Sequence, residues 1–100
     1  MTEKRLRPKY TVFRICPDGK PTIPGQKSTD PKDPDSPFVL MPRKDMAAFQ
    51  ALVIYSRYCE PELGKEIKDW LHVIAAAGPQ YGTQGIRNRK YALDSSIDSR

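Results

Sequence analysis

Hydrophobic side chains gather in two long segments of the chain, and the first of these covers residues 46–59. Apolar side chains recur there three or four positions apart, at Phe49, Leu52, Val53, Tyr55 and Cys59. This spacing predicts an α-helix. The intervening positions are also mostly apolar, so we expect a central helix that is buried on more than one side. Asp45 stands directly before the segment and is a favourable N-cap residue.

The second segment, residues 61–77, has the pattern of an amphipathic helix with one apolar face. That face consists of Leu63, Ile67, Leu71 and Ile74, with Trp70 beside it. The opposite face is charged. Pro61 suits a first helical turn, and Gly78 followed by Pro79 is a helix stop. Burying the apolar face would contribute roughly 8–12 kcal/mol before opposing terms, so packing rather than ion pairing is expected to hold the helix.

Two shorter segments, residues 10–16 and 38–41, are rich in β-branched and aromatic side chains. Such runs predict strands. Between them, Pro17–Lys20 (PDGK) has the residues of a tight turn. We therefore predict an α+β fold, in which a two-stranded antiparallel ribbon of 10–16 with 38–41 packs on a helical hairpin of 46–59 and 61–77.

Prolines shape the rest of the chain. Seven of the ten lie between residues 17 and 42, where continuous helix or central strand is excluded because proline lacks an N–H. The long polar loop that results is expected to be either mobile or bound to a partner. The predicted organisation is a basic arm at 1–9, one small domain at 10–78 with a Pro-rich loop at 17–37, and a basic Gly/Arg tail at 79–100 without regular structure.

The two cysteines and the single histidine limit the chemistry. Cys16, Cys59 and His72 are too few ligands for a structural zinc site. The cysteines form either a disulfide or, as we favour, two small buried thiols, and their distance from each other is left open. The start of the chain has no apolar signal segment, and no apolar run reaches the roughly 18–20 residues of a membrane span. We expect a protein of the cytoplasm or of a virion interior, with no membrane partner.

Positive charge is concentrated at the two ends of the chain. The formal net charge is +5, with +4 on residues 1–20, +1 on 21–44, −2 on 45–78 and +2 on 79–100. Basic ends on a mildly acidic helical segment indicate an anionic partner, often nucleic acid. The alternative is that these ends are charged only because they are solvated.

The candidate residues for an anionic partner lie in these two basic ends. They are Tyr81, Arg87, Arg89, Lys90 and Tyr91 near the C-terminus, and Lys4, Arg5, Arg7 and Lys9 near the N-terminus. Guanidinium groups bind phosphate in a bidentate manner, and tyrosines stack on unpaired bases. The C-terminal group equally suits a protein partner or an inert tail, and the N-terminal group a solubilising leader.

A further cluster, Tyr55, Arg57 and Tyr58, has the residue types of a protein interface. The competing interpretation places Tyr55 in the core and Tyr58 half-buried. His72 with Asp69 on one helix resembles catalytic residues only superficially, because no nucleophile or oxyanion hole accompanies them. No cofactor motif is present, and we expect no enzymatic activity.

The sequence thus predicts a non-catalytic accessory protein. Our first hypothesis is an interaction module that docks on a larger protein assembly or nucleoprotein complex, such as a virion, through its arms and its Pro-rich loop. The alternative is a nucleic-acid-binding accessory protein whose basic ends contact the DNA or RNA phosphate backbone. The sequence does not indicate the oligomeric state.

Overall fold

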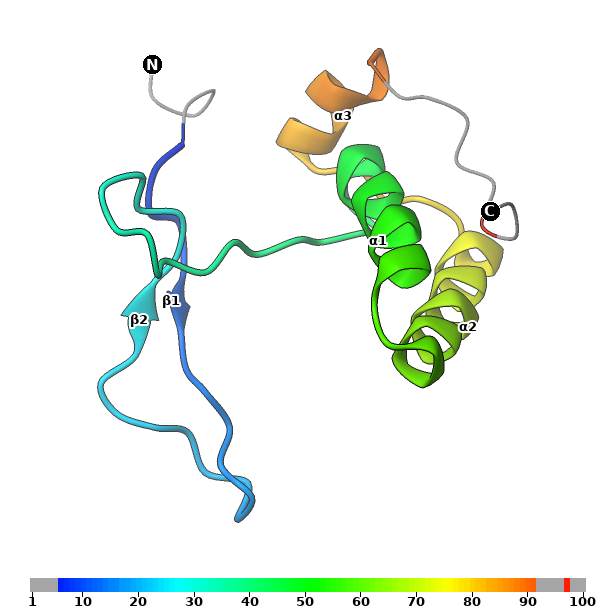
Figure 1. Ribbon diagram of the computed structural model, residues 1–100. Coiled ribbons are helices and arrows are strands. Elements are labelled where there is room, and N and C mark those ends of the chain that lie inside the picture. The colour runs from blue at the N-terminus through cyan, green and yellow to red at the C-terminus, as the bar shows by residue number, and fades with distance from the viewer. Residues whose placement is uncertain (1–5, 92–96, 98–100) are drawn as a thin grey trace. The chain divides into compact units, whose positions relative to one another are not determined.

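The computed structural model describes residues 6–91 and residue 97. The chain divides into two compact units, an N-terminal unit over Met1–Val39 and a helical unit over Leu40–Arg100. The first holds a two-stranded antiparallel sheet and the second holds three helices (Figure 1). The α+β class is confirmed. The predicted packing of the ribbon on the helices stays a prediction, and the predicted domain at 10–78 includes parts of both units.

The sheet of the N-terminal unit is a short ribbon. β1 (Thr11–Val12) and β2 (Gln26–Lys27) are antiparallel, with Thr11 opposite Lys27 and Val12 opposite Gln26. The predicted turn at Pro17–Lys20 is confirmed. The Asp18 carboxylate accepts a hydrogen bond from the Lys20 N–H at 2.9 Å, and Gly19 has a φ of 84°.

The predicted pairing of residues 10–16 with residues 38–41 is wrong, because β2 is the partner of β1 and residues 38–41 form no strand. The turn at Pro17–Lys20 reverses the chain at once, so the next extended segment lies beside β1 at a smaller loop-closure cost than residues 38–41. Pro21 and Pro24 then limit the ladder, since neither has an N–H to donate.

The Pro-rich loop is organised by its own hydrogen bonds. The Thr29 N–H donates to the Pro37 carbonyl at 2.8 Å, and the Asp30 N–H donates to Ser36 Oγ at 2.8 Å. The carboxylates of Asp30 and Asp33 each accept from the N–H two residues further on, which is the geometry of Asx turns. The unit has little core, because its large apolar side chains are mostly exposed: Tyr10, Phe13, Ile15, Ile23 and Phe38.

The predicted helical hairpin is confirmed as α1 (Met46–Tyr58) and α2 (Pro61–Ala77), which pack side by side (Figure 1). Asp45 is the N-cap, and its carboxylate accepts from the Ala47 N–H at 3.0 Å. Gly78, with a φ of 85°, ends α2 as expected. Within the described part of the chain, no helix combines the length and the apolar character that crossing a membrane requires.

The core of the helical unit lies between α1 and α2. Its buried centre is Phe49, Val53 and Leu71, and the partly buried residues around it are Met46, Leu52, Ile67, Ile74 and Ile97. Near the other end of the pair the helices approach so closely that a Cβ on Gly64 would overlap the Ser56 carbonyl. The hairpin is therefore held by aliphatic packing at one end and by backbone contact at the other.

The expectation that α1 is buried on more than one side is wrong. Ile54, Tyr55 and Tyr58 are 49%, 54% and 81% exposed. Trp70 and Leu63 of α2 are also more exposed than predicted, at 49% and 42%. α2 covers one face of α1 and α3 contacts only its start, so the remaining apolar positions of α1 stay at the surface.

The C-terminal segment was expected to lack regular structure, and this is wrong for Thr83–Arg89, which form α3. The N-cap of α3 is Gly82, which has no side chain that could cap the helix. A helix this short is unstable alone. It depends on contacts with the start of α1. Residues 92–96 and 98–100 of the predicted tail lie outside the described residues.

Candidate anion-binding surface

The segment that leads into α3 runs along the residues that lead into α1. The Gln80 N–H donates to the Arg43 carbonyl at 3.0 Å, and the Gly82 N–H donates to the Lys44 carbonyl at 3.2 Å. Gly85, buried in α3, lies against the same Lys44 carbonyl, with no room for a Cβ between them. Glycine is required here because the two backbones touch. α3 is therefore anchored at residues 43–45.

A side-chain contact adds to this anchor. Asn88 Nδ2 donates to both carboxylate oxygens of Asp45, at 3.0 and 3.1 Å. Gln84 Nε2 in turn donates to Asn88 Oδ1 at 3.2 Å. Asp45 thus serves two helices, as the N-cap of α1 and as the acceptor for α3. Its negative charge is engaged within the fold.

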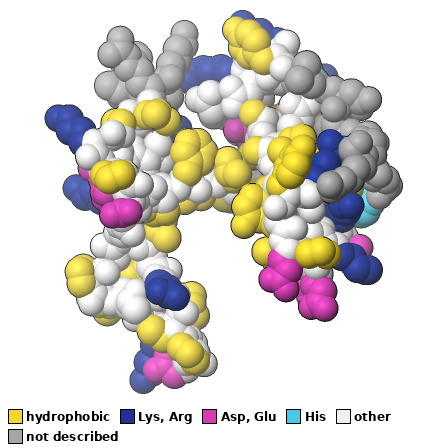
Figure 2. Space-filling model, in the orientation of Figure 1, with side chains coloured by type: hydrophobic (Ala, Val, Ile, Leu, Met, Phe, Trp, Pro, Cys, Tyr) yellow, Lys and Arg dark blue, Asp and Glu magenta, His cyan; other side chains and the backbone are white. Residues whose placement is uncertain are grey.

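These contacts gather positive charge at one end of the helical unit. We call this region the basic end, and it consists of Arg43, Lys44, Arg87, Arg89 and Lys90. Asp45 is the one acid among residues 40–45 and 78–91. The opposite end, where α1 connects to α2, carries Glu60 and Glu62. Figure 2 shows acidic side chains grouped at that connection, and basic ones both near α3 and over α2. The segments before and after α1 therefore differ in charge.

Two tyrosines of the basic end lie beside its cations. The Arg89 guanidinium is 5.8 Å from the centre of the Tyr81 ring, and Lys90 Nζ is 5.2 Å from the centre of the Tyr91 ring. Tyr81 is half-buried, whereas Tyr91 is 73% exposed. Of the two, Tyr91 has the surface that stacking on a ligand needs, and Tyr81 orients Arg89.

The structure brings together Tyr81, Arg87, Arg89, Lys90 and Tyr91, which the sequence grouped. The N-terminal candidates belong elsewhere. Lys4 and Arg5 lie outside the described residues, and Arg7 and Lys9 belong to the N-terminal unit. Lys9 is exposed and Arg7 is half-buried. That the N-terminal candidates bind the same polyanion as the C-terminal group stays a prediction.

The predicted protein-interface residues all lie on the last turns of α1. Tyr55 and Tyr58 are exposed, and Arg57 is half-buried. The competing interpretation, with Tyr55 in the core, is wrong because Tyr55 is 54% exposed. The tyrosines are accessible to a partner, and their role as an interface stays a prediction.

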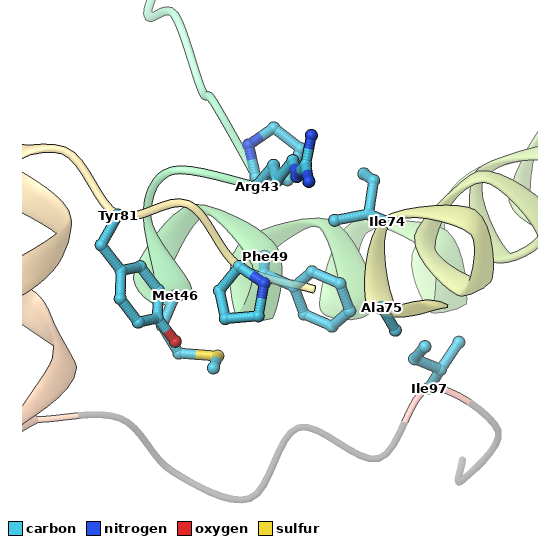
Figure 3. Close-up of a pocket in the computed structure, with 9 residues that line it drawn as sticks. Arg43, Met46, Phe49, Ile74, Ala75, Tyr81 and Ile97 are labelled. Atoms are coloured by element: carbon cyan, nitrogen blue, oxygen red, sulfur yellow. The ribbon is translucent and has the colours of Figure 1, made fainter. Parts of the chain in front are cut away.

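A pocket of about 270 Å³ opens between the start of α1 and the end of α2. Its walls are largely apolar, and Figure 3 shows Tyr81 and Met46 on one side with Ile74, Ala75 and Ile97 on the other. Arg43 lines it too, but its Nε donates to the Gly78 carbonyl at 2.9 Å and its Nη2 to the Ala77 carbonyl at 3.4 Å. Arg43 therefore mainly holds the end of α2.

The residues with catalytic or metal-binding potential are dispersed. Asp69 forms an exposed ion pair with Lys65 at 3.0 Å, and His72 is exposed on α2. Both cysteines are free thiols, one in each unit. Among residues 6–91 and 97, no group of three His, Cys, Asp or Glu side chains is placed to hold a metal ion.

Sequence reasoning missed Arg43 and Lys44 as parts of the basic end, and Asn88 and Gly85 as its organisers. Only the Asp45 cap was recognisable locally, because the partners of the Asn88 bond are 43 residues apart. Comparisons of this chain with protein-family models, with curated proteins and with solved structures found no match.

Proposed function

We propose that this protein is a non-catalytic accessory protein that attaches to a larger macromolecular assembly, and that the basic end of the helical unit is its attachment point. The observation that carries the proposal is the charge of that end. Its five cations lie in two segments that backbone hydrogen bonds join, and Asp45, the one acid among residues 40–45 and 78–91, is hydrogen-bonded to Asn88. Of the docking elements expected from the sequence, the C-terminal arm supplies three of these cations, Arg87, Arg89 and Lys90.

The ligand that fits best is the phosphate backbone of a nucleic acid. A row of phosphates matches several cations at once, and each neutralised phosphate releases a counterion. Arg89 and Lys90 are both exposed, and exposed Tyr91 offers a ring face to an unpaired base. α3, which carries Arg87 and Arg89, has only seven residues and is short for a helix that reads base edges in a groove. Binding is therefore expected to be non-specific and to depend on salt.

Fluorescence anisotropy tests this proposal directly. The full chain is titrated into labelled single-stranded and duplex DNA, and into RNA, at several salt concentrations. If three phosphates are contacted, log K against log salt has a slope of about −2 to −3. The double variant Arg89→Gln/Lys90→Gln is expected to reduce the magnitude of that slope by about 1.4–1.8 and to weaken binding at least about tenfold.

The matched control is Lys65→Gln/Lys68→Gln on α2. It also removes two positive charges, but from two lysines that lie outside the basic end. Affinity within about twofold of the unmodified chain is expected, because only long-range attraction is lost. Absence of binding at about 50 mM salt, or equal losses in both double variants, contradicts the proposal.

A second candidate function, docking on a protein, is favoured by a different observation. Leu63, Trp70 and Val73 of α2 are 42%, 49% and 65% exposed, and exposed tryptophan is typical of interface anchors. Affinity capture from the native source, comparing the full chain with Trp70→Ser and with Lys68→Ala as control, tests it. Partners that Trp70→Ser loses and Lys68→Ala retains support this function, and identical sets of partners contradict it.

A further inference from the structure

The outer face of α1 carries a regular apolar stripe. Ala47, Ala51, Ile54 and Tyr58 follow one another at intervals of four, three and four residues. This is the spacing of the contact positions in a pair of packed helices. All four are exposed, Ile54 at 49% and Tyr58 at 81%. They lie on the side of α1 opposite the core residues Phe49 and Val53. We call these four residues the outer stripe.

The outer stripe has small residues at one end and large ones at the other. Ala47 and Ala51 occupy the first turns of α1, and Ile54 and Tyr58 the last. A second helix lying in the same direction would place Ala against Ala and Tyr against Tyr. A helix lying in the opposite direction would place each small residue against a large one. Facing large and small side chains interdigitate without voids or overlap.

The charges at the two ends of the outer stripe also differ. Lys44 precedes α1, where the charge of Asp45 is engaged by Asn88, and Glu60 and Glu62 follow α1. The Arg43 guanidinium is bonded to the end of α2. The stripe itself carries no charge. In a parallel pair the basic ends would repel each other, and so would the acidic ends. In an antiparallel pair each basic end faces an acidic end, and the helix dipoles are also opposed.

We propose that the occupant of the outer stripe is a second copy of this chain, packed antiparallel about a two-fold axis that passes near the middle of α1. Ala47 then faces Tyr58 of the partner subunit, and Ala51 faces the partner's Ile54. Lys44 lies opposite Glu60 and Glu62 of the partner subunit. Such an interface is isologous, so each of these contacts occurs twice. The dimer does not depend on the proposed function, since it needs no nucleic acid and shares only Lys44 with the basic end.

The strength of this dimer is limited by its size. Stable interfaces bury about 1,200–2,000 Å² in total, and one face of a 13-residue helix supplies less than that. We therefore expect a reversible dimer with a dissociation constant on the order of 10–100 µM. The chain charge of +5 opposes association, and the paired ends offset this locally.

Sedimentation equilibrium and light scattering of the full chain, from about 5 to 500 µM and without nucleic acid, test the proposal. The unmodified chain is expected to shift from monomer to dimer in this range. Ala51→Glu puts a carboxylate in the stripe and is expected to weaken dimerisation at least about tenfold. Ala76→Glu, at an exposed position of α2, is the matched control and is expected to dimerise as the unmodified chain does.

A charge exchange tests the antiparallel direction. Lys44→Glu and Glu62→Lys are each expected to weaken the dimer about two- to fivefold, and the double variant to recover most of the affinity. Far-UV circular dichroism confirms that each variant is folded. The proposal is overturned if the unmodified chain stays monomeric to about 500 µM, which is expected if its own N-terminal unit or a foreign protein occupies the stripe. It is also overturned if Ala51→Glu dimerises as the unmodified chain does, or if the double variant dimerises more weakly than either single variant.

Discussion

The side-chain amide of Asn88 donates to both carboxylate oxygens of Asp45, at 3.0 and 3.1 Å. Asp45 is at the same time the N-cap of α1, through its bond from the Ala47 N–H. One carboxylate therefore caps one helix and holds another. This bond fixes α3 beside residues 43–45, and so it places Arg87, Arg89 and Lys90 next to Lys44.

Asn88→Ala is expected to destabilise the helical unit by about 1 kcal/mol, because it removes a hydrogen bond to a charged acceptor that stays partly accessible to water. Urea unfolding followed by circular dichroism measures the change. Thr83→Ala, at an exposed position of α3, is the control and should have an effect below about 0.5 kcal/mol. Equal effects of the two variants would show that the Asp45 contact does not hold α3.

Gly85→Ala is expected to detach α3, because the added Cβ would overlap the Lys44 carbonyl. The cost is about 1–3 kcal/mol, the usual range for forced overlap at a packed contact. Amide hydrogen exchange should therefore be roughly tenfold to a hundredfold faster in α3, with α2 little changed. Gly82→Ala is the matched control, since nothing lies within 4 Å of its Cβ position. Unchanged exchange in Gly85→Ala would contradict the close contact.

Gly64→Ala reverses the usual sign of a glycine substitution in a helix. At an unconstrained helix position alanine is the more stable residue by about 0.5–1 kcal/mol. At Gly64 the Cβ would meet the Ser56 carbonyl, so we expect a loss of about 1–3 kcal/mol as α1 and α2 move apart. Thermal and urea unfolding measure this change. Stabilisation by the substitution would mean that the two helices are further apart than the structure shows.

Leu71 and Leu63 lie on the same helix and were predicted to share one apolar face, yet their burial differs. Leu71 is fully buried, whereas Leu63 is 42% exposed. Leu71→Ala is expected to cost about 2–5 kcal/mol, enough to unfold much of a small unit, and Leu63→Ala about 1 kcal/mol or less. Circular dichroism at increasing urea compares the two. Similar losses would place Leu63 in the core.

The helical hairpin was predictable because its signals are local. For α2, Pro61 marks the start, the apolar period marks the buried face and Gly78 marks the end, and the structure agrees on where the helix begins and ends. Asp45 was likewise recognisable as a cap from its side chain and position. The basic residues of the candidate site were visible as charges, but not as neighbours.

The strand pairing and the exposure of α1 were not predictable in the same way. Residues 38–41 have a more strand-like composition than Gln26–Lys27 of β2, so composition favours the segment that forms no strand. The apolar positions of α1 exceed what one neighbouring helix covers, and the sequence does not say which of them are left outside. Both outcomes depend on which segments meet in space.

Sequence alone therefore determined the limits of α2, those of α1 to within one residue, the turn at Pro17–Lys20 and the sign of the charge at the C-terminal end. These depend on side chains at most a few residues apart, whose geometry the backbone period sets. Only the tertiary structure decided that Thr83–Arg89 form a helix and that Lys44 joins the basic end. A seven-residue helix gains too little from its own hydrogen bonds to offset the cost of nucleation, so it exists only where Gly85 and Asn88 meet the start of α1.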